Sequence, residues 1–245
     1  MALDIVDLRV FYASPLGGVA QALIARAIQG RWPDMRGYSL LGLGYAPPYL
    51  ELLRGGSERA LAFMPATLGV MHWPGHGLSA SALVEPTDMP LRDSSVDRLL
   101  LVHALEMSQY PGALLEEIWR VLTPGGRLIA IVPKRAGFWA RSDSTPFGQG
   151  QPYSREQLTL LLREALFTPM HWGEALYLPP SRRKLVMRCA AAWERIAAAL
   201  NLPFAGVHVI EAAKQIYRPA LAKKPARAIH SVKPVLAPAG GLAAR

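Results

Sequence analysis

One short apolar run in the middle of the chain constrains the fold most. The four residues from Leu99 to Val102 are all apolar, which is typical of a parallel strand covered on both faces. Similar short runs occupy residues 38–41, 60–64, 80–84 and 128–132. Because helix-like segments or turns separate these runs, they predict a mostly parallel sheet with helices on both faces. We expect the strand that contains Leu40 to lie at the centre of the sheet, between the strands that contain Phe63 and Leu101.

Helical spacing and capping signals place the helices. Apolar residues recur at helical spacing over residues 16–28, so we expect Phe11 and Tyr12 to precede the first helix. Helices are also expected to begin at the prolines 47–48, at Pro111, and at the capping box of Ser154 and Gln157. A tight turn at residues 123–126 is expected to end the helix after Pro111. A helix over 184–200, between strands 172–178 and 207–216, completes a doubly wound sheet of seven strands.

Composition restricts the class of protein and the cellular compartment that we expect. Hydrophobic residues make up 51% of the 245 residues, enough for a large core without disulfides. The single cysteine, Cys189, excludes an intramolecular disulfide and a cysteine-rich zinc site, and no other spacing indicates a metal site. Asp4 and Asp7 argue against a signal peptide, and prolines and glycines interrupt the uncharged stretch 60–84, so no membrane span is expected. We therefore expect a cytoplasmic protein.

The net charge of +9 is distributed unevenly. Residues 1–217 contain 21 basic and 18 acidic residues, a net +3, whereas residues 218–245 contain six basic residues and no acidic one. The second segment is rich in Ala and Pro and has little to bury. We therefore expect a folded domain over 1–217 and a basic, disordered tail over 218–245.

Three segments resemble one known family. The first is Leu40–Leu41–Gly42–Leu43–Gly44–Tyr45–Ala46. The second runs from Glu85 to Leu91 and continues as Asp93–Ser94–Ser95–Val96–Asp97. The third runs from Leu115 to Leu128 and contains Arg-Val-Leu-Thr-Pro-Gly-Gly. In order and spacing they resemble the class I S-adenosylmethionine-dependent methyltransferases of the ubiquinone-biosynthesis-like group, also called type 11. The resemblance implies a Rossmann-like fold.

The resemblance also implies a cofactor site for S-adenosylmethionine. The residues it places at the cofactor are Gly42, Leu43, Gly44, Tyr45, Glu85, Asp88, Met89, His103 and Tyr12. The glycines let the backbone approach the methionine part of the cofactor, Glu85 takes the place of the acid that contacts the adenine amino group, and Asp88 and Met89 flank the ring. His103 follows the strand that faces the methyl group, with Glu106 three residues later, and is the candidate general base.

Two departures from the family pattern leave alternatives open. The acids expected at the ends of the first two strands are replaced by Leu40 and Met64. The favoured function is methyl transfer to a small-molecule acceptor. One alternative is a cofactor-binding protein that has lost catalysis. Another is an RNA methyltransferase, since residues 134–141 mix basic and aromatic groups that suit nucleic acid.

Overall fold

The computed structural model describes residues 3–181, 183, 186–187, 189–200 and 202–216. The predicted tail, 218–245, lies outside the described residues, as does most of residues 182–188. All seven expected strands fall within the described part and form one sheet.

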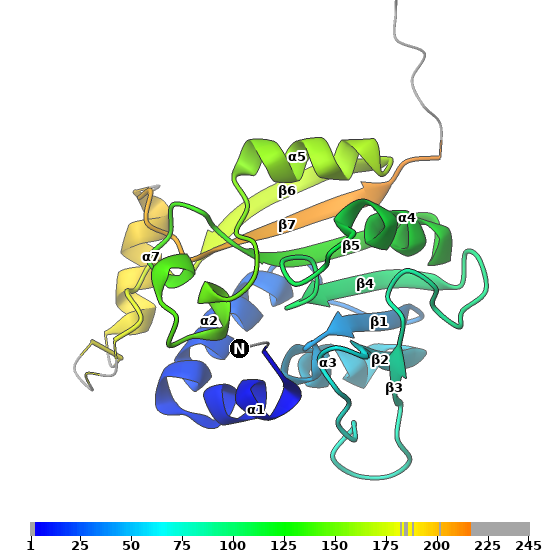
Figure 1. The fold of residues 1–245 in the computed structure, drawn as a ribbon, viewed down its shortest axis with the longest axis horizontal. Coiled ribbons are helices and arrows are strands. Elements are labelled where there is room, and N and C mark those ends of the chain that lie inside the picture. Colours follow the sequence, from blue (N-terminus) through cyan, green and yellow to red (C-terminus); the bar gives the residue numbers. More distant parts are fainter. Residues whose placement is uncertain (1–2, 182, 184–185, 188, 201, 217–245) are drawn as a thin grey trace, which may run out of the picture.

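The sheet has the strand order β3-β2-β1-β4-β5-β7-β6 (Figure 1). The strands are β1 Ser39–Gly44, β2 Arg59–Pro65, β3 Ser81–Val84, β4 Val96–Val102, β5 Leu122–Pro133, β6 Phe167–Ala175 and β7 Val207–Lys214. β1 pairs in parallel with β2 and β4, as predicted from the apolar runs. β7 runs antiparallel to both its neighbours, β5 and β6, and the other strand pairs are parallel. The order reverses at β1, so the carboxyl ends of β1 and β4 lie at the switch point where such sheets bind ligands.

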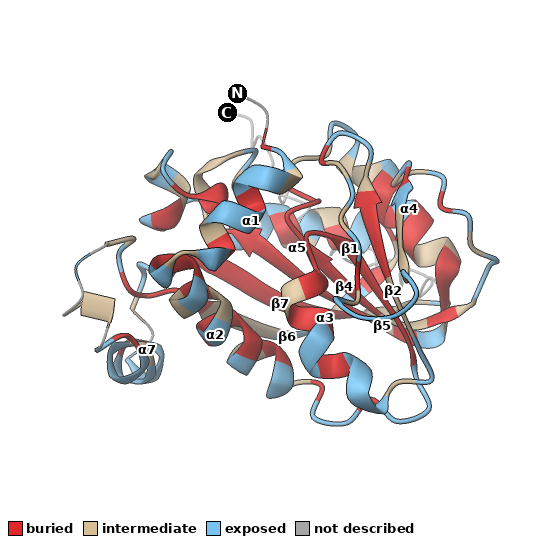
Figure 2. Ribbon diagram, turned by 90° about the horizontal axis from the view of Figure 1, so that it is seen from below, coloured by how far each residue is buried: buried red, intermediate tan, exposed pale blue. Residues whose placement is uncertain are grey.

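Helices cover both faces of the sheet. They are α1 Ile5–Ala13, α2 Pro15–Gln29, α3 Pro47–Leu53, α4 Pro111–Val121, α5 Arg155–Glu164 and α7 Ala190–Ala199, with short 3-10 turns η1 Arg54–Gly56, η2 Trp139–Arg141 and η3 Pro146–Gly148. Residues of α1, α2 and α3 form one apolar layer with the sheet, and residues of α4 and α5 form the other. Figure 2 shows the buried strands between these layers.

β4 shows how the sequence builds both layers. Leu99 and Leu101 face the α4 and α5 layer, whereas Leu100 and Val102 face the layer of α1, α2 and α3. Side chains alternate between the faces of a strand, and all four are at most 1% exposed. Burying each contributes about 1.5–3 kcal/mol, so the uninterrupted apolar run is a requirement of this central position.

Several boundaries differ from the sequence-based expectations. Phe11 and Tyr12 do not precede the first helix: they belong to α1, which Asp4 caps by accepting from the backbone N–H groups of Val6 and Asp7 at 2.8 Å each. β-Branched and aromatic residues in α1 hid its helical signal. The motif 123–126 does not form the turn that was expected to end the helix, since α4 already ends at Val121. The motif lies within β5, where the pairing with β4 is irregular.

In the last part of the chain, the bounds of the strands and of the helix also differ from the predicted ones. β6 begins at Phe167, five residues earlier than expected, because it pairs with β7 along its whole length despite a register shift. The described helix there is α7, Ala190–Ala199, shorter than the predicted 184–200. Within the part of the chain that is described, no single helix is long and apolar enough to cross a membrane, although the bent pair α1 and α2 together pass that test of length and composition.

Candidate functional site

A cavity of about 390 Å³ lies at the carboxyl ends of β2, β3 and β4. We call it the strand-end cavity. Its walls come from the loops that follow these strands, namely residues 65–68, 85–87 and 103–110, with Leu3 and Leu114 closing the sides. A volume of this order is typical of sites for small molecules, about 300–1,000 Å³. Of the nine predicted cofactor residues, Glu85 and His103 line this cavity.

Glu85 stands at the rim of the cavity, directly after β3. Its Oε1 accepts from the hydroxyl of Thr87 at 3.0 Å, and both residues line the cavity. The side chain is exposed and forms no ion pair with a described residue. A carboxylate held this way retains capacity to accept from an amino group of a ligand.

His103 is buried and joined to two other side chains. Its Nδ1 lies 3.1 Å from Oε1 of Glu106, and its Nε2 lies 2.9 Å from the hydroxyl of Tyr12. Since a carboxylate only accepts, Nδ1 donates to Glu106, and in the neutral ring Nε2 accepts from Tyr12. The backbone of His103 has φ 50°, a left-handed conformation that is unusual outside glycine and occurs often at functional sites.

Tyr12 connects this pair to α3 and to the glycine segment. Its hydroxyl lies 3.1 Å from that of Tyr49, and its ring stacks on Tyr45 with centroids 5.2 Å apart. Burial, together with the nearby Tyr49 and Glu106, raises the pKa of Tyr12 well above its ordinary value. The phenol therefore keeps its proton and remains available as a donor to His103.

The glycine segment is packed against the protein itself. A Cβ on Gly44, whose φ is +87°, would collide with the carbonyl oxygen of Val102, and one on Gly42 would collide with Ala46 and Leu50. These glycines therefore allow β1 to approach β4 and α3 closely. Leu43 is buried in the layer formed with α4 and α5. Contact of this segment with a cofactor stays a prediction.

The remaining two predicted residues lie outside the walls of the strand-end cavity. Asp88 is exposed and its backbone N–H donates to the carbonyl of Glu85. Met89 is 2% exposed and packs in the layer of α4 and α5. Both belong to the turn that follows Glu85, and a direct contact with the cofactor stays a prediction.

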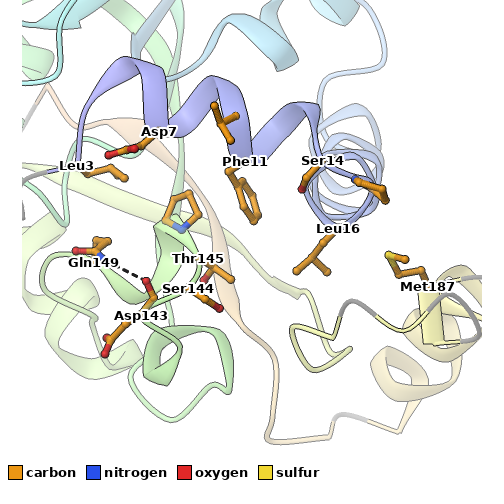
Figure 3. A pocket seen from close by; sticks show the side chains of 13 residues that line it. Leu3, Asp7, Phe11, Ser14, Leu16, Asp143, Ser144, Thr145, Gln149 and Met187 are labelled. Atoms are coloured by element: carbon orange, nitrogen blue, oxygen red, sulfur yellow. Dashed lines mark hydrogen bonds between the residues drawn. The ribbon is translucent and has the colours of Figure 1, made fainter.

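A larger cavity of about 610 Å³ adjoins the first, with Leu3 in the walls of both. We call it the helix-side cavity. α1 and the start of α2 form one wall, and the loop 143–149 and Met187 form the other, as Figure 3 shows. Phe11 and Leu16 point into it, and Asp7, Ser14 and Thr145 supply polar groups. The strand-end cavity is thus formed by loops at the ends of strands, whereas the helix-side cavity is formed by segments outside the sheet. The buried Tyr12 directly follows Phe11, a wall residue of the helix-side cavity, in α1.

The basic and aromatic loop over residues 134–141 is largely used within the fold. Lys134 is ion-paired with Glu174 at 2.7 Å, and the buried Trp139 donates to the carbonyl of Leu178 at 2.6 Å. Phe138 stacks on Phe204 with centroids 5.7 Å apart. The groups that suggested contact with nucleic acid are therefore mostly engaged with the protein.

Sequence reasoning missed most of the cavity walls. It identified His103 together with Glu106, and Tyr12 apart from them, yet Tyr12 and His103 are bonded across 91 positions of the sequence, which no local pattern reveals. Phe147, which lies 4.8 Å from the His103 ring between centroids, had no sequence signal beyond a loop rich in Gly and Pro. Among the described residues, no three His, Cys, Asp or Glu side chains are grouped so that they could hold a metal ion.

Comparison with known proteins connects this architecture to methyltransferases. Residues 71–130 match the family model described as a methyltransferase domain. This range includes β3, β4, α4 and most of β5, and therefore Glu85, His103 and Glu106. No curated protein matches the chain.

Solved structures extend the likeness to most of the chain. A methyltransferase from Thermotoga maritima is 17% identical, with a TM-score of 0.58 over 86% of this chain and 96% of that one. The 4+2 cyclase SpnF is 21% identical, with a TM-score of 0.56 over 79% and 80%. The 1,6-didemethyltoxoflavin N1-methyltransferase of Burkholderia thailandensis, solved with bound 1,6-didemethyltoxoflavin and S-adenosylhomocysteine, is 18% identical, with a TM-score of 0.52 over 80% and 79%. The chain therefore has the Rossmann-like fold of the class I S-adenosylmethionine-dependent methyltransferases.

Proposed function

We propose that the protein is a methyltransferase that binds S-adenosylmethionine in the strand-end cavity and a small-molecule acceptor in the helix-side cavity. The observation that carries the proposal is the placement of two adjoining cavities at the carboxyl end of the sheet, with the bonded chain of Tyr12, His103 and Glu106 at that end. The matched methyltransferase domain supports it, because it contains the loops that form most of the strand-end cavity.

The strand-end cavity suits the adenosine part of the cofactor. Leu68, Ala104 and Leu114 supply an apolar surface for a flat ring, and Glu85 supplies an acceptor for an amino group. Beside the glycine segment, the rings of Tyr12 and Tyr45 fill the space. The methionine part would therefore lie next to Tyr12, and we expect this side chain to adjust when the cofactor binds.

His103 is the proposed base. The bound cofactor supplies an activated methyl group with a good leaving group, so the protein mainly aligns the acceptor. Glu106 holds Nδ1 of His103 as the donor, which leaves the lone pair on Nε2. In the structure Tyr12 donates to this lone pair. Movement of Tyr12 would free Nε2 to take a proton from an acceptor that keeps it at the working pH.

Calorimetric titration with S-adenosylmethionine and S-adenosylhomocysteine tests the proposal. Wild-type protein is expected to bind both. Glu85→Ala should weaken binding by about 1–3 kcal/mol if a buried hydrogen bond loses its acceptor, whereas Glu116→Ala, which removes an exposed acid from α4, should leave it unchanged. Absence of binding to either compound at millimolar concentration would refute the methyltransferase proposal.

A cofactor-binding protein without catalysis is the second candidate. Leu40 and Met64, which stand where the family has acids, are both buried in apolar surroundings. In addition, Tyr12 occupies the space beside the glycine segment. These observations favour the second candidate. Tight binding of S-adenosylhomocysteine without methyl transfer to a broad panel of amines, phenols and thiols would favour this candidate. Turnover of any acceptor that is abolished by His103→Asn and retained by His171→Asn, an exposed control, would favour the enzyme.

A further inference from the structure

A third hollow lies at the opposite end of the sheet from the two cavities. It is a shallow groove of about 480 Å³ between the carboxyl end of α2 and the strands β5, β6 and β7. Its walls are Arg26, Ala27, Gly30, Arg31, Arg127, His171, Trp172 and Glu211. Arg127 pairs with Arg98 near the amino end of the parallel strands, so this groove is distinct from the strand-end cavity. We call it the arginine groove.

Arg31 is the central cation of this groove. Its guanidinium reaches from the turn after α2 to the surface of β6, where a Cβ on Gly173 would collide with its Nη2 atom. Glycine within a strand often marks the close approach of another group. The Nη1 atom donates to the carbonyl of Ala27 at 2.7 Å, while Nε is buried without a hydrogen-bond partner among the described residues. Partial burial lowers the pKa of Arg31 from its ordinary value, and the negative charge of Glu211 opposes this shift in part.

The groove has an excess of positive charge. Arg127 is neutralised by Glu211, whose Oε1 lies 3.0 Å from its Nη1 and also accepts from Trp32. Arg26 and Arg31 form no ion pair of this kind with any carboxylate in the described part of the chain. The groove is therefore lined by three guanidinium groups and one carboxylate, a net charge of two positive, with the exposed His171 beside them.

From this arrangement we infer that the arginine groove is a binding site for a small phosphorylated compound, separate from the cofactor and acceptor sites. The net charge of two positive in the groove lining matches the double negative charge of a phosphomonoester, and guanidinium binds phosphate oxygens with paired N–H donors. The volume exceeds what a phosphate ion alone would fill, which leaves room for an organic part.

The test uses the full chain and follows binding of ribose 5-phosphate by calorimetry at constant ionic strength. Wild-type protein is expected to bind it, and Arg31→Gln and Arg26→Gln should each weaken binding by about tenfold or more, as the loss of a charge-assisted hydrogen bond implies. Arg36→Gln is the matched control, because Arg36 is exposed and paired with Asp34 outside the groove. It should bind as the wild type does.

Further ligands and a second substitution make the test decisive. Ribose without phosphate should not bind, and inorganic phosphate should bind more weakly than the ester if the organic part contributes. Gly173→Ala should displace Arg31 and weaken binding while every arginine is kept. Melting curves confirm that each variant is folded. Equal binding by wild type, Arg31→Gln and Arg36→Gln would show only general charge attraction and would overturn the proposal, as would the absence of binding to the wild type.

Discussion

At the scale of single residues, the structure separates buried polar groups that are bonded from those that are not. The hydroxyl of Tyr12 bonds both His103 and Tyr49, whereas the buried hydroxyl of Tyr153 has no partner among the described residues. Removing one side of a buried hydrogen bond leaves the other side unsatisfied, which costs about 1–3 kcal/mol. The two tyrosines should therefore respond oppositely to the same chemical change.

We predict that Tyr12→Phe lowers the free energy of unfolding by about 1–3 kcal/mol, because His103 and Tyr49 lose their shared partner. Tyr153→Phe should leave this free energy unchanged or raise it, since the lost hydroxyl had no bond to lose. Urea unfolding of the three proteins at neutral pH measures the difference. Equal destabilisation by both substitutions would show that the bonded cluster contributes nothing specific.

His208 gives a pH-dependent prediction. Burial lowers its pKa from 6.5 to about 4, although Glu174 lies 3.6 Å from Nδ1. Between these values the unfolded chain binds a proton at His208 and the folded chain does not, so stability falls as pH falls, by roughly 3 kcal/mol in total. We expect His208→Leu to flatten the loss of stability between pH 6.5 and 4 in urea titrations. A wild-type slope in the variant would mean that other groups cause the loss.

At the scale of elements, the segment most similar to the methyltransferase pattern serves to hold a loop. Glu117 of α4 accepts from the backbone N–H of Met89 at 2.7 Å, and Arg120 donates to Glu117 and to the carbonyls of Met89 and Leu91. This network fixes the loop after β3, which carries Glu85. The motif therefore positions the strand-end cavity from a distance.

Arg120→Met should destabilise the fold by about 2–4 kcal/mol, because it leaves the buried carboxylate of Glu117 without its cation. It should also weaken binding of S-adenosylhomocysteine, since the loop that carries Glu85 loses its anchor. Arg163→Met, an exposed change on α5, is the control for both measurements. Thermal melts and calorimetry provide the two values. A variant as stable as the control would show that the network does not support the loop.

At the scale of the whole molecule, the sheet followed from the sequence, whereas the arrangement of its cavities did not. The uninterrupted run at β4, the capping box of α5 and the place of β1 between β2 and β4 were all predicted and confirmed, because periodicity and capping are local signals. The bonding of Tyr12 to His103 depends on how α1 packs across β4, and local signals do not encode such packing. α1 itself was missed, so its wall of the helix-side cavity was missed with it.

Hydrogen exchange should map the cofactor onto this architecture. If S-adenosylhomocysteine occupies the strand-end cavity, amides in residues 65–68, 85–87 and 103–110 should gain protection, because these loops form its walls. α1 should gain protection as well, since Leu3 and Tyr12 connect it to that cavity. The carboxyl end of α2 and β6 around Gly173 should not change, because the arginine groove lies at the opposite end of the sheet. Ribose 5-phosphate should produce the reverse pattern. Protection by both ligands in one shared region would refute the separation of the two sites.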